Sequence, residues 1–185
     1  MQISKKKLRI LDLDIENRPL SYWGENPTSE ITAIASCWTD DIGSLEVSLL
    51  GRDDPVEMLL AFVRRYVEAD VVTAHNIRGH DLPTINGALI EYGLPQLGPK
   101  MAVDTYLDMK KRKGIPASQE YLLDLFNLSK KVHMGQDDWR ESNRLLGSGL
   151  SKTERRCTQD VLDHMRLRPE MVKRGLLNSP KIWHP

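Results

Sequence analysis

Hydrophobic and polar positions change their repeat several times along the chain, and the order of these changes predicts an α/β fold. Residues 8–15 alternate as a β-strand does, and further strands are predicted over residues 31–38 and 45–50. A turn-forming stretch at residues 40–43 lies between the last two strands. The first part of the chain therefore predicts an antiparallel meander of three strands.

Helical and strand repeats alternate after residue 54. Asp54 suits the N-cap of a helix and Pro55 suits its first position, and apolar residues at helical spacing follow them. The expected elements are a helix to about residue 67, a strand at 71–74, a helix from Asp81 to about residue 92, a strand at 101–106, and helices at 118–128 and from Ser151 toward Pro169. We therefore expect a central mixed sheet of five strands, three antiparallel and then parallel, flanked by helices.

The chain length sets the number of domains. With 185 residues, the chain can build one sizeable core and is short for two domains. No internal repeat, low-complexity segment or linker interrupts the pattern. We expect one domain over residues 1–185, with a core from about residue 8 to 167 and a C-terminal helical tail over residues 168–185.

Composition restricts the partners of this domain. Lys plus Arg and Asp plus Glu number 26 each, so no overall field attracts a polyanion and any contact with nucleic acid has to be local. Cys37 and Cys157 lack the spacing of a zinc site and are expected to be free thiols. No signal-peptide core or long apolar segment is found, so we expect a cytoplasmic protein without membrane contact.

The first strand carries acidic residues at every second position. In LDLDIEN, residues 11–17, Asp12, Asp14 and Glu16 fall on one face because strand side chains alternate. Like charges on one sheet face repel unless water, a cation or a basic partner compensates them. A solvated acidic face on an exposed edge strand is the alternative interpretation.

Two further acidic residues join this group from distant segments. Asp81 follows the strand at 71–74, and Asp160 lies within the last predicted helix. With Asp14 and Glu16 they form four carboxylates that can meet at one edge of the sheet. Oxygen ligands of this kind suit Mg²⁺ or Mn²⁺, and two such ions about 3.5–4 Å apart can hold the attacking and leaving oxygens of a phosphoryl displacement. As alternatives, Asp81 caps its helix, and Asp160 pairs with Arg156 in competition with a metal.

Three motifs support this grouping. Residues 14–16 resemble a D-x-E motif, residues 74–76 with Asp81 resemble an AHN-x-x-x-D motif with one extra residue in the gap, and residues 157–161 resemble a C-x-x-D-V motif. In this order, the motifs are similar to those of the DEDD superfamily of 3′-5′ exonucleases, which have the ribonuclease H-like fold. Asp104-Thr105 also resembles a recurrent D-T pair of that family.

The resemblance implies a role for each carboxylate. Asp14 would bridge two metal ions, Glu16 and Asp160 would bind the first, and Asp81 would support the second. The ions would be Mg²⁺ or Mn²⁺. Asp12 falls where the family has an apolar or aromatic residue, so we expect an accessory carboxylate at best.

Candidate substrate contacts come from three segments. Asn76 would shape the substrate loop, together with His75, for which ordinary loop polarity is the alternative. Tyr22 and Trp23 are candidates for stacking on an unpaired base, with core packing as the alternative. Arg156 is a candidate for phosphate contact.

The third motif departs from the family in one respect. Family members place a tyrosine four residues, or a histidine five residues, before the last aspartate, to orient or deprotonate the attacking water. Arg156 and Arg155 stand at these positions, and a guanidinium cannot act as a base. Lys152 and His164 lie on turns before and after Asp160 and are the candidate substitutes. Lys152 would need a strongly lowered pKa, and His164 has a solvent-facing position as its alternative.

The motifs favour a metal-dependent 3′-5′ exonuclease acting on a single-stranded or frayed nucleic-acid end, DNA in preference, and releasing nucleoside 5′-monophosphates. If it proofreads, it does so through a partner such as a polymerase or another replication or repair protein. One alternative is a nucleic-acid-binding relative with weak or no catalysis, in which Arg155 and Arg156 contact phosphate. The other is a ribonuclease H-like endonuclease or resolvase.

Overall fold

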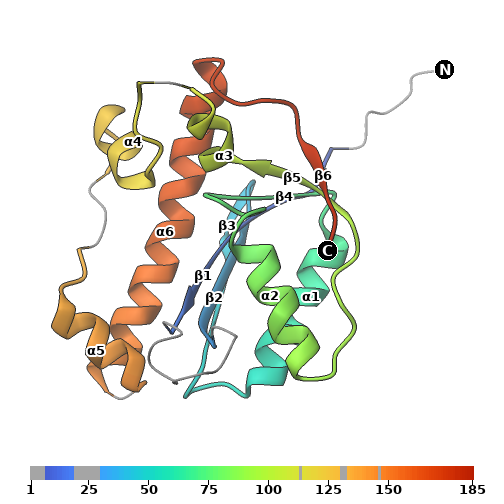
Figure 1. Ribbon diagram of the computed structural model, residues 1–185, viewed down its shortest axis with the longest axis vertical. Coiled ribbons are helices and arrows are strands. Elements are labelled where there is room, and N and C mark those ends of the chain that lie inside the picture. The colour runs from blue at the N-terminus through green and yellow to red at the C-terminus, as the bar shows by residue number, and fades with distance from the viewer. Residues whose placement is uncertain (1–6, 19–29, 113, 130–132, 146) are drawn as a thin grey trace.

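The centre of the protein is a mixed β-sheet (Figure 1). The computed structural model describes residues 7–18, 30–112, 114–129, 133–145 and 147–185. Within these residues the sheet has six strands in the order β3-β2-β1-β4-β5-β6. The strands are β1 (Ile10–Asn17), β2 (Ile31–Trp38), β3 (Asp41–Leu49), β4 (Val71–Ala74), β5 (Lys100–Asp104) and β6 (Lys181–Trp183).

Strand directions follow the predicted division of the chain. β2 pairs antiparallel with β1 and with β3, whereas β4 pairs parallel with β1 and with β5. β6 pairs antiparallel with β5. The predicted α/β class and mixed sheet are confirmed. The predicted number of five strands is wrong, because β6 was not predicted.

Helices cover both faces of the sheet. Figure 1 shows α6 on one side of the sheet and α1 and α2 on the other. The helices are α1 (Pro55–Glu68), α2 (Asp81–Glu91), α3 (Thr105–Lys110), α4 (Gln119–Leu125), α5 (Gln136–Arg144) and α6 (Ser148–Lys173). In the part of the chain that the structure describes, no helix has the length and apolarity needed to span a membrane.

Helix starts depend on local hydrogen bonds. The Asp54 carboxylate accepts hydrogen bonds from the amides of Val56 and Glu57 at 2.9 and 3.1 Å, so the predicted N-cap of α1 is confirmed.

The last long helix, α6, begins at Ser148, three residues before the predicted start at Ser151. The backbone of Glu141 in α5 lies so close to Gly149 that a Cβ atom there would clash with it. Glycine therefore allows α5 to pack tightly against the first turn of α6.

Other elements also differ from the sequence prediction. The strand predicted at 101–106 ends at Asp104, because Asp104 caps α3, which begins at Thr105. β3 begins inside the predicted turn because Trp38 and Asp41 already pair across a two-residue turn. α5 was not predicted, since its sequence, QDDWRESNR, carries no apolar stripe. The tail predicted as helical over residues 168–185 continues α6 only to Lys173 and then forms β6, which is too short to show a strand repeat.

The alternation predicted for β1 separates its two faces. Leu11, Leu13 and Ile15 are buried in the core formed with α1 and α2. On the other face of the sheet, alanines of β2 pack with Cys157 and Val161 of α6. The acidic residues of β1 occupy the positions between the three apolar residues, on the α6 side. The strand therefore presents its carboxylates to α6.

Asp12 is the most deeply buried of these carboxylates. Its oxygens accept hydrogen bonds from the hydroxyl of Thr39, from Nδ1 of His164 at 2.8 Å and from Arg168 at 3.5 Å. Burial alone raises the Asp12 pKa, but the hydrogen bond and charge of His164, with Arg168 and Thr39, bring the pKa below its ordinary value. Asp12 is thus a buried anion held by partners from α6.

We predict that Asp12→Ala destabilises the fold by about 3–5 kcal/mol, because it leaves the buried His164 without its hydrogen-bond partner and the largely buried Arg168 without its counter-ion. The free energy of unfolding in urea measures this loss. Asp40→Ala serves as the control, since Asp40 pairs with Lys7 on the surface and a small change is expected. A loss below about 1 kcal/mol for Asp12→Ala would contradict the structural role assigned to this carboxylate.

Candidate metal centre

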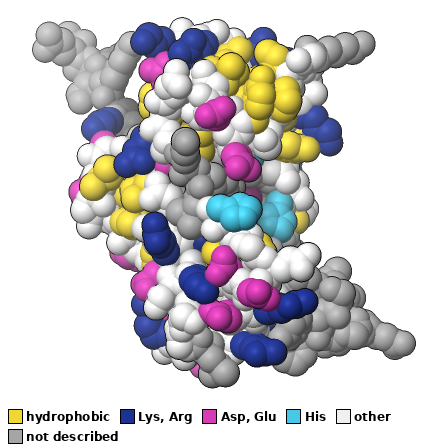
Figure 2. Space-filling view, turned by 90° about the vertical axis from the view of Figure 1, so that its left-hand side faces the viewer, with side chains coloured by type: hydrophobic (Ala, Val, Ile, Leu, Met, Phe, Trp, Pro, Cys, Tyr) yellow, Lys and Arg dark blue, Asp and Glu magenta, His cyan; other side chains and the backbone are white. Residues whose placement is uncertain are grey.

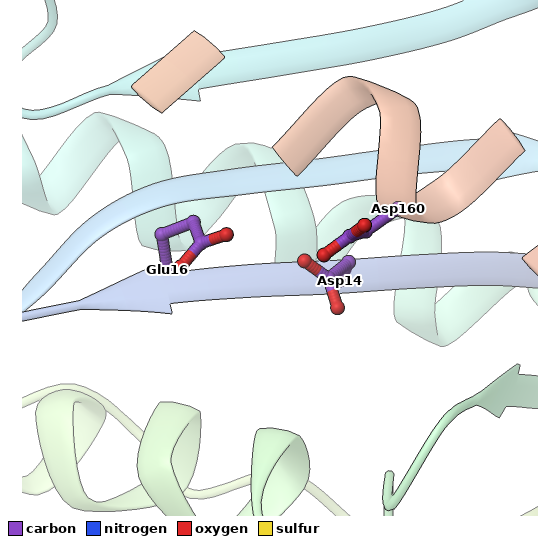
Figure 3. Close-up of side chains that lie close together, drawn as sticks. All are labelled: Asp14, Glu16 and Asp160. Atoms are coloured by element: carbon purple, nitrogen blue, oxygen red, sulfur yellow. The ribbon is translucent and has the colours of Figure 1, made fainter. Parts of the chain in front are cut away.

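Three of the predicted metal ligands lie together at the contact between β1 and α6. One carboxylate oxygen from each of Asp14, Glu16 and Asp160 lies within 4.8 Å of the other two. Figure 3 shows Asp14 and Glu16 on β1, with the carboxylates of Asp14 and Asp160 pointing toward each other across the gap to α6. Asp160 is buried, and the two residues of β1 are half-buried. The structure therefore brings Asp160 to Asp14 and Glu16, which lie 144 or more positions before it in the sequence.

A buried cysteine fixes the position of α6 over these carboxylates. The thiol of Cys157 donates a hydrogen bond to the backbone carbonyl of Asp14, with 3.4 Å between Sγ and O. Burial, and then the charges of Asp14, Glu16 and Asp160, raise the pKa of this thiol well above its ordinary value, so it remains a donor. Asp160 follows three residues later, on the next turn of the helix.

Asp81 lies beside the three carboxylates but outside the group whose oxygens lie within 4.8 Å of one another. It is the first residue of α2 and is 1 % exposed. Its carboxylate accepts a hydrogen bond from the backbone amide of Ile15, the residue between Asp14 and Glu16. The other oxygen, Oδ2, has no hydrogen-bond partner among the described residues. Burial, opposed by backbone hydrogen bonds and assisted by the charges of Asp104 and Glu16, raises the Asp81 pKa to about 7.

Asp104 organises the loop that follows β4. Its buried carboxylate accepts hydrogen bonds from the amides of Asn76 and Arg78 at 3.2 and 3.0 Å, and from the amide of Leu107 at 2.9 Å. Asn76 has a φ angle of 78°, which asparagine adopts more readily than most residues. Asp104 therefore ties the loop carrying His75 and Asn76 to the start of α3. The D-T pair indicated its presence in the sequence but not this role.

A cavity of about 480 Å³ is lined in part by Arg156, which contacts two of the candidate metal ligands. Three of the residues named as candidate substrate contacts, His75, Asn76 and Arg156, line it, and Tyr106 and Trp139 supply aromatic side chains. Nδ1 of His75 lies 2.9 Å from the hydroxyl of Thr105, and its ring contacts the Tyr106 ring edge-on. Figure 2 shows histidine side chains near the middle of this face, with acidic and basic side chains below them.

The two aromatic residues that line the cavity, Tyr106 and Trp139, were not predicted from the sequence. Tyr106 directly follows the D-T pair at the end of β5, and this position is a signal that could have indicated it. Trp139 lies on α5, whose position no motif indicates. The predicted stacking residues, Tyr22 and Trp23, lie outside the described residues.

Arg156 contacts two of the candidate metal ligands. Its Nε atom lies 3.0 Å from Oδ2 of Asp160 and 3.4 Å from Oε1 of Glu16. The pairing with Asp160 spans one helical turn, as the sequence allows, and the contact with Glu16 crosses from α6 to β1. Arg156 thus belongs both to the cavity and to the carboxylate group.

The structure argues against both candidate bases. Nζ of Lys152 lies 2.8 Å from carboxylate oxygens of Asp138 and Glu141, and these hydrogen bonds raise the Lys152 pKa, whereas a base needs it lowered. His164 is 1 % exposed and directs Nδ1 to Asp12. Spacing along one helix suggested both residues, and partners on α5 and β1 determine where they point.

The raised pKa of Asp81 predicts a pH-dependent stability. Between the ordinary value of 3.8 and about 7, the folded protein retains a proton that the unfolded chain has released. Stability from this group therefore falls as the pH rises through that window. Asp81→Asn removes this titrating group. Between pH 4 and pH 8, we therefore expect the free energy of unfolding of wild type to fall by roughly 1–4 kcal/mol more than that of Asp81→Asn.

Urea unfolding in EDTA at pH 4, 6 and 8 measures this difference, because titrating groups that do not interact with Asp81 contribute equally to both proteins. Asp137→Asn, at an exposed position of α5, is the matched control and should follow the wild-type profile. Parallel profiles for Asp81→Asn and wild type would show that the Asp81 pKa is ordinary.

Comparisons with known proteins establish the fold. No family model matches the chain, and no curated protein matches it. Among solved structures, the chain is similar to the family B DNA polymerase from the hyperthermophilic archaeon Pyrobaculum calidifontis, with a TM-score of 0.73 and 19 % sequence identity. The match covers 95 % of this chain and 26 % of the polymerase chain, so the chain spans about a quarter of its length. The α/β architecture is thus compatible with the ribonuclease H-like fold.

Proposed function

We propose that the protein is a metal-dependent 3′-5′ exonuclease that hydrolyses phosphodiester bonds at a single-stranded or frayed nucleic-acid end. The observation that carries this proposal is the group of Asp14, Glu16 and Asp160, whose carboxylate oxygens lie within 4.8 Å of one another. Arg156 contacts this group and lines the adjacent cavity, which links the group to a space for substrate.

The donor atoms fit a hard divalent cation. All three residues offer carboxylate oxygens, which are the ligands that Mg²⁺ and Mn²⁺ prefer, and no thiolate belongs to the group. Asp81 adds an oxygen without a hydrogen-bond partner among the described residues. Glu16 and Asp160 would hold one ion, Asp14 would bridge two, and Asp81 would support the second. Ions bound there would supply an activated water and stabilise the charge on the phosphate.

The cavity supports an unpaired nucleic-acid end as the substrate. Tyr106 and Trp139 offer aromatic faces, which hold unpaired bases without regard to sequence. The guanidinium of Arg156 suits a phosphate, and the amide of Asn76 offers both a donor and an acceptor. The volume of about 480 Å³ is in the range of small-ligand pockets. These features favour recognition of a terminal nucleotide.

The likeness to a DNA polymerase supports a function related to nucleic acid. The finer part of the proposal, 3′-5′ polarity and release of nucleoside 5′-monophosphates, depends on the three sequence motifs. DNA is the favoured substrate because the similar structure is that of a DNA polymerase.

A binding module without catalysis is the second candidate. Arg156 occupies a position where the resembled family has a residue that orients the attacking water, and it pairs with two of the three ligands. A carboxylate group facing a polyanion is unfavourable for a pure binder, however, unless a cation is bound there. Cleavage of the substrate separates the two candidates.

The proposal predicts loss of hydrolysis in Asp14→Ala and Asp160→Ala. We expect each variant to remain folded and to lose at least about a hundredfold in rate, because several kcal/mol of cation-mediated stabilisation disappear. The assay follows a 5′-labelled single-stranded DNA in Mg²⁺, in Mn²⁺ and in excess EDTA. Asp137→Ala should retain the wild-type rate.

Shortening from the 3′ end, dependent on the metal, is the expected result. A circular single strand should stay intact, and its cleavage would indicate the endonuclease alternative. Near-wild-type rates in either aspartate variant would reject the metal ligands, and intact DNA and RNA that nevertheless bind would favour the binding module.

Lys152→Ala should leave the rate of hydrolysis within about tenfold of wild type, since Lys152 is held by carboxylates of α5. Loss of a general base costs about 10²–10⁴ in rate. A loss in that range, in a variant with unchanged thermal stability, would restore Lys152 as the base.

A further inference from the structure

Arg156 supplies a positive charge to the carboxylate group. The side chains of Arg156, Glu16 and Asp160 are 15, 14 and 5 % exposed, so their charges are poorly screened by water. A guanidinium stays protonated at every accessible pH. Its contacts at 3.0 and 3.4 Å therefore offset part of the repulsion among the three carboxylates.

A divalent cation cannot take Glu16 and Asp160 without affecting this arrangement. Two positive charges close together in a poorly screened site repel each other, and the double charge of a divalent ion doubles the energy of this repulsion. The same carboxylates would also have to divide their oxygens between the ion and the guanidinium. Binding of the ion thus favours movement of Arg156 away from Glu16 and Asp160.

The cavity provides a place for the displaced guanidinium. Arg156 lines it together with Asn76, His75 and Tyr106, where the substrate phosphate would lie. Guanidinium and phosphate match in charge and in the geometry of their hydrogen bonds. A guanidinium released from the carboxylates therefore becomes available to the nucleic acid.

We propose that Arg156 is an exchangeable counter-ion: it neutralises Glu16 and Asp160, and a divalent cation displaces it toward the phosphate of the nucleic acid in the cavity. Cation and nucleic acid then bind cooperatively. A bound cation moves Arg156 toward the phosphate, and a bound phosphate draws Arg156 away from the carboxylates that hold the cation. The inference rests on the proposed function, of which it describes the regulation.

Calorimetric titration with Mn²⁺ alone tests the first half of the inference. We expect Arg156→Gln to bind Mn²⁺ about tenfold tighter than wild type, because the competing guanidinium is absent. Arg155→Gln is the matched control: it removes the same charge one residue away, at an exposed position beside β3, and should leave the affinity unchanged. Arg156→Lys keeps the charge without the planar guanidinium and should lie between wild type and Arg156→Gln.

Equal Mn²⁺ affinities for wild type, Arg156→Gln and Arg156→Lys would overturn the inference. Asp160→Asn separates this result from failure of the proposed function. If Asp160→Asn binds Mn²⁺ as wild type does, the metal centre itself is misassigned. If Asp160→Asn loses binding while the Arg156 variants match wild type, the metal centre holds and only the counter-ion role fails.

Binding of DNA tests the second half. The probe is a fluorescent single-stranded DNA whose 3′-terminal linkages are phosphorothioates, so that binding is measured without cleavage. Mn²⁺ should tighten its binding to wild type by a factor in the usual range of about 5–150 for coupled sites, and the DNA should tighten Mn²⁺ binding by the same factor. In Arg156→Gln we expect this factor to be at least roughly threefold smaller. An unchanged factor would overturn the proposed exchange.

Discussion

Three carboxylates on one face of β1 lie against α6, and the helix compensates them unequally. Its residues at every fourth position face the strand: Arg156, Asp160, His164 and Arg168. Asp12 receives a hydrogen bond from His164 and the charge of Arg168, and it is fully buried. One helical turn before His164, Asp160 adds a carboxylate to those of Asp14 and Glu16. The same contact therefore stabilises the fold at one end and concentrates negative charge at the other.

The excess of negative charge lies near the carboxyl ends of the parallel strands. β1, β4 and β5 are parallel, so their carboxyl ends meet at one edge of the sheet. The loop after β4 presents Asn76 there, and Asp104 at the end of β5 holds this loop in place. In open α/β sheets, ligands bind outside the carboxyl ends of the strands. Strand direction thus explains why residues from distant segments surround one cavity.

Local patterns of the sequence predicted much of this arrangement. Alternation along residues 11–17 indicated the acidic face of β1, and the three motifs indicated Asp14, Glu16 and Asp160, which the structure brings together. The burial of Asp12 could not be predicted, because its partners His164 and Arg168 lie 152 and 156 residues away and their positions depend on how α6 lies across the sheet. The sequence shows only the spacing of Lys152 along its own helix, whereas its contacts are with α5, which has no apolar stripe that would predict it.

In the mechanism that we propose, the excess charge of Asp14, Glu16 and Asp160 binds a divalent cation in competition with Arg156. Anomalous diffraction from crystals soaked in Mn²⁺ tests this competition, because one data set locates the ion in the anomalous map and the guanidinium in the electron-density map. We expect an anomalous peak between these three carboxylates, with Arg156 no longer within ion-pair distance of both Glu16 and Asp160. An absent peak at saturating Mn²⁺, with Arg156 still paired to both carboxylates, would contradict it.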